Sequence, residues 1–222
     1  RNDLIKMPNF TQEQISQFHR DGFLIFNNLI DMELVKIARS HFEPLFNGVF
    51  PTGIIPDKPK WQHQGPVNAE GIPRSICNMW KSDPTIAAIT LSEEIGKACA
   101  TLMGWPGVRI NQDHMIYLPP GAGTIGHHQD DSYQDWNEPE NIITCWISLD
   151  DTSGLSGPIE YVPGSNKWPL ADRIDQFAAP PDYRKELDIE AKKLGHEIDI
   201  VHVEVPAGGG SFHHGLTWHG SN

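Results

Sequence analysis

The sequence predicts a mainly β fold, a sandwich or barrel with helices packed on one side. Residues 1–106 show helical spacing of apolar residues, whereas residues 107–222 hold short apolar stretches separated by glycine- and proline-rich turns. Leading helices followed by many short strands are typical of this architecture. A chain of 222 residues can bury one full core, so we expect a single domain with a helical part at 1–106 and a β core at 107–222.

Four helices are expected in the first part, each opened by a capping residue and continued by apolar residues on one face. Thr11 and Gln14 fit a capping box, and Gly22 ends that helix before a short apolar strand. Asp31 and Ser92 can cap two later helices. The expected helices are 11–21, 31–46, 84–89 and 92–103.

Beyond Gly107 the apolar pattern alternates and is rich in β-branched and aromatic residues, which favours strands. The polar stretch 168–194 is expected to be an insertion that is helical in part. The stretch 47–73 is rich in Gly, Pro, Gln and Asn, and we expect an irregular loop of the kind that often covers a binding site. The expected strands are 23–26, 108–118, 142–149, 159–162 and 198–205, with a turn at 206–210 leading to 211–214.

The charge balance excludes some classes of partner. The chain carries 29 acidic and 17 basic residues, a formal net charge of -12, which argues against a nucleic-acid or anionic-membrane surface. No run approaches the roughly 20 apolar residues of a membrane span. Cys77, Cys99 and Cys145 match no zinc or redox motif, so we expect reduced thiols and a cytoplasmic protein. The oligomeric state is left open.

One group of residues has the composition of a metal site. His128, Asp130 and a later histidine offer two imidazoles and one carboxylate, the set that holds non-haem Fe(II) on one face and leaves the other open. His128 and Asp130 are two apart, so on a strand both would project to the same side. The third ligand should come from another strand. Spacing alone allows either His214 or His219, with His219 the better candidate.

Three other His-x-carboxylate pairs occur, and context argues against each as a ligand pair. Two lie in segments expected to be helical, where residues two apart do not face each other. The third is flanked by valines, so its polar side chains are expected to face solvent. These pairs are His19/Asp21, His41/Glu43 and His202/Glu204.

Seven short segments form a set of motifs whose order and spacing along the chain are specific enough to indicate a family. They are 11–26, 118–121, 127–130, 144–151, 157–167, 211–214 and 218–222. These segments resemble the phytanoyl-CoA dioxygenase family of Fe(II)/2-oxoglutarate oxygenases, and the resemblance covers nearly the whole chain. It implies a double-stranded β-helix, a jelly roll like that of cupins, with the N-terminal helices packed on one sheet.

The resemblance also implies roles for individual residues. His128, Asp130 and His219 carry over as the iron ligands. Trp146 and Ser221 stand where the family contacts 2-oxoglutarate, and His114 falls where the family also lines that cosubstrate. The implied cofactors are Fe(II), 2-oxoglutarate and O2. The implied reaction hydroxylates or otherwise oxidises an unactivated C–H of a small-molecule metabolite, with release of succinate and CO2.

One departure from the family concerns the distal carboxylate of 2-oxoglutarate. The family pairs it with an Arg several residues beyond the Gly-Ser-Asn stretch, and this sequence stops at Asn222. We therefore expect that Arg and the final strand to lie outside the sequence. Arg109, Arg173 and Arg184 are possible substitutes, but no motif places them.

Substrate residues are expected among aromatic, amide and imidazole side chains, which suit a small polar or amphipathic molecule. The candidates are Trp61, His63, Gln64, His127, Gln129, Tyr133, Trp136, Glu160 and His214. Three other classes stay open: a cupin-like metalloenzyme that does not use 2-oxoglutarate, such as an isomerase; a non-catalytic jelly roll that binds a small molecule; and a family member that has lost activity. Succinate formation that depends on Fe(II) and 2-oxoglutarate separates these classes from the oxygenase.

Overall fold

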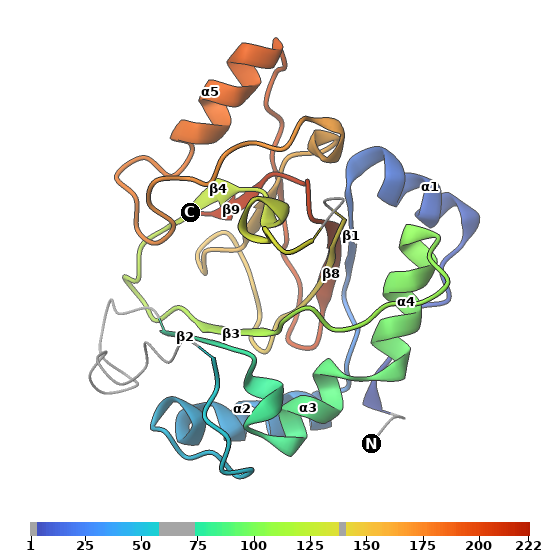
Figure 1. The fold of residues 1–222 in the computed structure, drawn as a ribbon, viewed down its shortest axis with the longest axis vertical. Helices are drawn as coiled ribbons and strands as arrows, with labels where there is room; N and C mark the ends of the chain where they lie inside the picture. The colour runs from blue at the N-terminus through green and yellow to red at the C-terminus, as the bar shows by residue number, and fades with distance from the viewer. Residues whose placement is uncertain (1–3, 58–73, 138–140) are drawn as a thin grey trace.

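Helices and antiparallel sheets are mixed in the computed structural model, which describes residues 4–57, 74–137 and 141–222 (Figure 1). The helices are at least as prominent as the strands, so the content is more mixed than the mainly β chain we expected. Among the described residues, no helix is both long and apolar enough to cross a lipid bilayer.

The helices begin where the capping residues predict. Thr11 and Gln14 form a complete capping box, and Gly22 ends the first helix at a φ of +89°. Asp31 and Ser92 each accept a hydrogen bond from a backbone N–H in the first turn of the helix that follows. The helices are α1 (Gln12–Asp21), α2 (Met32–Phe46), α3 (Pro84–Thr90), α4 (Glu93–Met103) and α5 (Lys185–Leu194).

The strands form three antiparallel sheets, with the orders β1-β8-β5, β2-β3 and β4-β9-β6-β7. Three short 3₁₀ helices lie between them: η3 (Met79–Lys81), η4 (Asp130–Tyr133) and η5 (Ser165–Lys167). The strands are β1 (Phe23–Phe26), β2 (Arg74–Cys77), β3 (His114–Tyr117), β4 (Ile125–His128), β5 (Ile143–Ile147), β6 (Ile159–Tyr161), β7 (Val201–His202), β8 (Gly210–His214) and β9 (His219–Ser221).

Two expected strands are much shorter than predicted. The expected strand 108–118 is a strand only in β3, because its partner β2 spans only four residues. Asp113, just before β3, turns its carboxylate to the backbone N–H of Trp80 instead. The expected strand 198–205 is reduced to β7, since the N–H of Glu204 bonds locally to the carbonyl of His202. His202 and Glu204 are both exposed, as predicted from their valine neighbours.

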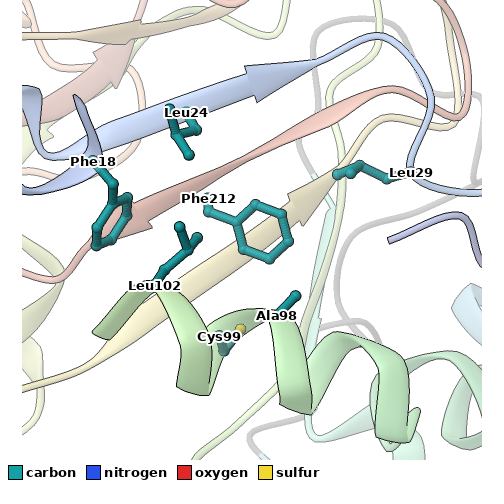
Figure 2. Close-up of a cluster of buried hydrophobic side chains, with 7 residues drawn as sticks. All are labelled: Phe18, Leu24, Leu29, Ala98, Cys99, Leu102 and Phe212. Atoms are coloured by element: carbon teal, nitrogen blue, oxygen red, sulfur yellow. The ribbon is translucent and has the colours of Figure 1, made fainter. Parts of the chain in front are cut away.

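Alternation along the strands separates an outer and an inner face of the β1-β8-β5 sheet. Leu24 and Phe212 point outward into a buried cluster with Phe18 of α1 and Leu102 of α4, so both helices cover this face (Figure 2). Trp146 points inward and packs against a second cluster, whose buried members are Phe23, Tyr161, Val203 and Val205. Because that cluster joins β1 and β5 to β6 and β7, the two larger sheets pack face to face.

Candidate metal centre

The three predicted ligands converge at one end of the β4-β9 pair. His128 is the last residue of β4 and lies opposite His219, the first residue of β9. Asp130 Oδ1 lies 3.4 Å from His128 Nε2 and 3.5 Å from His219 Nε2. One donor atom from each residue lies within 4.8 Å of the other two, and no other group of this kind occurs among the described residues. The predicted triad therefore forms a group that could hold a metal ion.

The route by which Asp130 reaches the site differs from our expectation. We placed His128 and Asp130 on one strand, but β4 ends at His128 and Asp130 opens η4. The 3₁₀ turn brings the carboxylate back toward the histidine, so the two side chains still meet. The spacing therefore indicated a pair that does come together, but the expected reason, two side chains on one face of a strand, does not apply, because Asp130 lies outside β4.

Both histidine ligands are held in the tautomer that binds a metal. His128 Nδ1 lies 2.8 Å from the carbonyl of Gly126, and His219 Nδ1 lies 2.9 Å from the carbonyl of Thr217. A carbonyl oxygen can only accept, so each Nδ1 carries the proton and donates it. Each Nε2 therefore keeps a lone pair that points toward Asp130 Oδ1.

The pKa shifts of Asp130 and His219 also suit a cation. Burial raises the pKa of Asp130, but the neighbouring His219, together with His128 and His213, outweighs burial and holds that pKa well below its usual range. Burial and the nearby His128 hold the pKa of His219 well below its usual value. An ionised carboxylate and neutral imidazoles are the forms that ligate metals. Because the three donor atoms lie within 4.8 Å of one another, a single ion placed among them could contact all three.

Sequence reasoning missed two residues that hold Asp130. Thr144 Oγ1 donates to Asp130 Oδ2 at 2.8 Å, and His213 Nε2 lies 3.0 Å from the same oxygen. The sequence pattern indicates only His214 and His219 as candidates for the third ligand, and it assigns no role to His213. Phe212 offered a signal, because an apolar residue on the outer face of a strand places both its neighbours, Ser211 and His213, on the inner face.

A cavity of about 1820 Å³ opens over the triad. Its walls include β3 and β5, both of which are edge strands of their sheets. Trp146, Ser221 and His114, the residues expected near 2-oxoglutarate, all line it. Arg109 lines it as well, whereas Arg173 is engaged by the carbonyl of Ser132.

The substrate candidates are scattered. Of the described ones, only Trp136 is part of the cavity lining. Gln129 is buried and bonds to the backbone of Pro169, Ala171 and Leu216, so it ties loops together. Trp61, His63 and Gln64 lie outside the described residues.

The other candidates point elsewhere. His127 and Glu160 face each other on the side of the sheet opposite the triad, with Nε2 and Oε2 3.5 Å apart. Tyr133 packs edge-on against the ring of His128, and His214 Nδ1 accepts from the N–H of Leu216. None of these four is among the described residues that line the cavity.

Comparison with known proteins identifies the family. Residues 18–222 match the family described as phytanoyl-CoA dioxygenase (PhyH). The chain belongs to the phytanoyl-CoA dioxygenase family. Ectoine dioxygenase of Stutzerimonas stutzeri (strain A1501) is 24% identical, with 100% of this chain and 74% of that relative covered. The peroxisomal phytanoyl-CoA dioxygenase of Rattus norvegicus is 26% identical over 94% of this chain, which spans only 62% of that enzyme.

Two solved structures show a similar fold. The non-heme alpha ketoglutarate dependent carbocyclase SnoK from nogalamycin biosynthesis has a TM-score of 0.70 at 21% identity, covering 96% of this chain and 78% of its own. EctD from S. alaskensis, solved with 2-oxoglutarate and 5-hydroxyectoine, has a TM-score of 0.67 at 18% identity. The match covers 98% of this chain and 73% of EctD. The cofactor prediction of Fe(II), 2-oxoglutarate and O2 is confirmed at the level of family and ligand triad.

Proposed function

We propose that this chain is an Fe(II)- and 2-oxoglutarate-dependent oxygenase that hydroxylates an unactivated C–H bond of a small-molecule metabolite, with release of succinate and CO2. The observation that carries the proposal is the convergence of His128, Asp130 and His219 on the wall of an open cavity. Iron with its cosubstrates would supply oxidising chemistry that protein side chains lack. The two packed sheets are proposed to form a double-stranded β-helix with the N-terminal helices on one sheet.

The protein's own contribution is to bind and orient. His128, Asp130 and His219 would hold the iron from one side, and the cavity on the other side would admit 2-oxoglutarate and O2. Trp146 and Ser221, on β5 and β9, are proposed to contact 2-oxoglutarate, because both line the cavity beside the triad. His114 lines the cavity from β3 and is proposed to complete that subsite. Asp130 supports hydroxylation rather than halogenation, because its carboxylate fills the position that a halide would need.

The relatives suggest where to look for a substrate. Those reported above are named for ectoine, a small metabolite, and for an acyl-CoA. The formal net charge of -12 makes a phosphate-rich CoA ester the less favourable of the two for this chain. We therefore propose a small metabolite without phosphate groups as the substrate class.

Succinate formation tests the proposal. Wild-type protein is incubated with Fe(II), 2-oxoglutarate and a panel that includes ectoine and an acyl-CoA, and succinate is measured with Asp130→Ala as the blank. We expect substrate-dependent succinate from the wild type and none above background from the variant. Full turnover by Asp130→Ala would show that the ligand assignment is wrong. A converted substrate without any succinate would instead identify a cupin-like enzyme of another class.

A further inference from the structure

The two oxygens of the Asp130 carboxylate have different surroundings. Oδ1 faces the two Nε2 atoms of the histidine ligands, at 3.4 and 3.5 Å. Oδ2 faces protein donors, with Thr144 Oγ1 at 2.8 Å and His213 Nε2 at 3.0 Å. One oxygen is thus turned toward the metal position while the other is held by the protein.

His213 is built into the wall behind Asp130. It is 2% exposed and lies on the inner face of β8, directly across from Thr144 of β5. Its ring packs against those of His219 and Tyr161, with centroid distances of 4.4 and 5.2 Å. Because the imidazole is buried against two other rings, it cannot rotate without disturbing the core.

A short chain of hydrogen bonds fixes which nitrogen of His213 donates. Tyr161 Oη lies 2.8 Å from His213 Nδ1 and 2.7 Å from Ser211 Oγ, and all three side chains are buried. An ionised carboxylate only accepts, so His213 Nε2 must carry a proton toward Asp130. In the neutral ring Nδ1 then accepts from the Tyr161 hydroxyl, which in turn accepts from Ser211. Every donor in the chain points toward Asp130 Oδ2.

We propose that His213 is a positioning residue that keeps Asp130 a one-oxygen ligand. With Oδ2 occupied by His213 and Thr144, only Oδ1 can reach the metal. A carboxylate released from these bonds can turn and bind through both oxygens, which would take up a position that the cosubstrates need. His213 therefore determines how many coordination positions on the metal stay open. Tyr161 keeps the proton of His213 on Nε2, where it faces Asp130. This inference rests on the proposed function, since it concerns the same metal.

The test uses Co(II) as the probe, because its visible absorption reports binding and coordination number without turnover. His213→Phe removes the donor, His213→Gln keeps an N–H near the place of Nε2, and Tyr161→Phe removes only the hydroxyl. His41→Phe is the matched control, because His41 Nδ1 bonds to the buried Asp83 at 2.7 Å and does not line the cavity. Infrared difference spectra report whether the carboxylate binds through one oxygen or two, and thermal unfolding reports folding.

We expect His213→Phe to weaken Co(II) binding by about 10- to 100-fold and to shift the carboxylate bands to the two-oxygen pattern. His213→Gln should restore most of the affinity and the one-oxygen bands, and Tyr161→Phe should show a smaller change in the same direction. His41→Phe should lower the melting temperature and leave Co(II) binding unchanged. A folded His213→Phe with wild-type affinity and bands would overturn the inference. If His213→Phe does not fold, unchanged affinity and bands in Tyr161→Phe would do so. Wild-type protein that binds no Co(II) would overturn the proposed function, and this inference with it.

Discussion

His127 and His128 are neighbours on β4, yet they belong to two histidine–carboxylate clusters on opposite faces of one sheet. The inner cluster is the triad of His128, Asp130 and His219. The outer cluster follows one row across the sheet: His127 reaches past Gly220 toward Glu160, and Glu160 lies opposite the exposed His202. Similar residue types have thus produced two different sites.

Access and proton placement distinguish the clusters. In the inner cluster, backbone carbonyls hold the Nδ1 protons, so the Nε2 lone pairs face an open cavity. In the outer cluster, His127 is 0% and Glu160 2% exposed, and the two side chains face each other with Tyr183 beside them. Burial lowers the pKa of His127 to about 4, so this imidazole is neutral near pH 7. Composition alone therefore does not make a metal site, because the donor atoms must also converge on accessible space.

The largest expected effect separates the two neighbouring histidines. His128→Ala is expected to weaken Co(II) binding by more than about 100-fold, because it removes a ligand rather than a supporting group. His127→Ala should leave the affinity unchanged but lower the free energy of unfolding by about 2 kcal/mol, since it removes the polar group that faces Oε2 of the buried Glu160. Co(II) titration and urea unfolding of the metal-free protein measure the two effects. Equal losses of affinity would show that the outer cluster takes part in metal binding.

A smaller effect is expected where the outer row crosses β9. A Cβ at Gly220 would lie 2.8 Å from His127 Nδ1 and 2.8 Å from the carbonyl of Ile125, too close for either to stay in place. Gly220→Ala should therefore cost about 2 kcal/mol of unfolding free energy, because the backbone of β4 must shift.

Gly96 provides the control for that experiment. In α4 the nearest atom to a Cβ at Gly96 is Val108 Cγ2 at 3.5 Å, an ordinary contact. Gly96→Ala should stabilise the protein by about 0.5–1 kcal/mol, because alanine favours the helix. Urea unfolding of both variants decides the matter. Equal stability of the two variants would show that a Cβ at Gly220 can be accommodated beside His127 and Ile125 without a shift of β4.

The contrast also shows which features the sequence could predict. Helix starts at Thr11, Asp31 and Ser92 were predictable because a cap acts within its own turn. The short strands β2 and β9 were not predicted, because their own residues form no apolar run and pairing with a partner defines them. The equally short β1 and β6 were predicted, because their residues are mostly apolar or aromatic.

The metal site likewise contains residues that the sequence could predict and residues that it could not. The ligand types at His128 and Asp130 were visible as a spaced pair, and the family resemblance selected His219. His213 was missed because its role depends on β8 lying beside β5, which places it opposite Thr144 and next to Asp130. No local pattern contains that pairing, since the two strands are far apart in the sequence.

The smallest expected effect tests the alternation along β5. Both Trp146 and Cys145 line the cavity, but Trp146 packs on the inner face with Tyr161, and Cys145 packs on the outer face with Phe212. Trp146→Phe is expected to weaken 2-oxoglutarate binding by about tenfold, an effect of about 1.4 kcal/mol, because the indole helps to line the cosubstrate subsite. Cys145→Ala should lower stability by about 1 kcal/mol through lost packing and leave 2-oxoglutarate binding unchanged. Binding of 2-oxoglutarate to the Co(II)-loaded proteins, measured beside urea unfolding, separates the two roles. If Trp146→Phe lost stability but bound 2-oxoglutarate normally, Trp146 would be a core residue and the cosubstrate would lie elsewhere in the cavity.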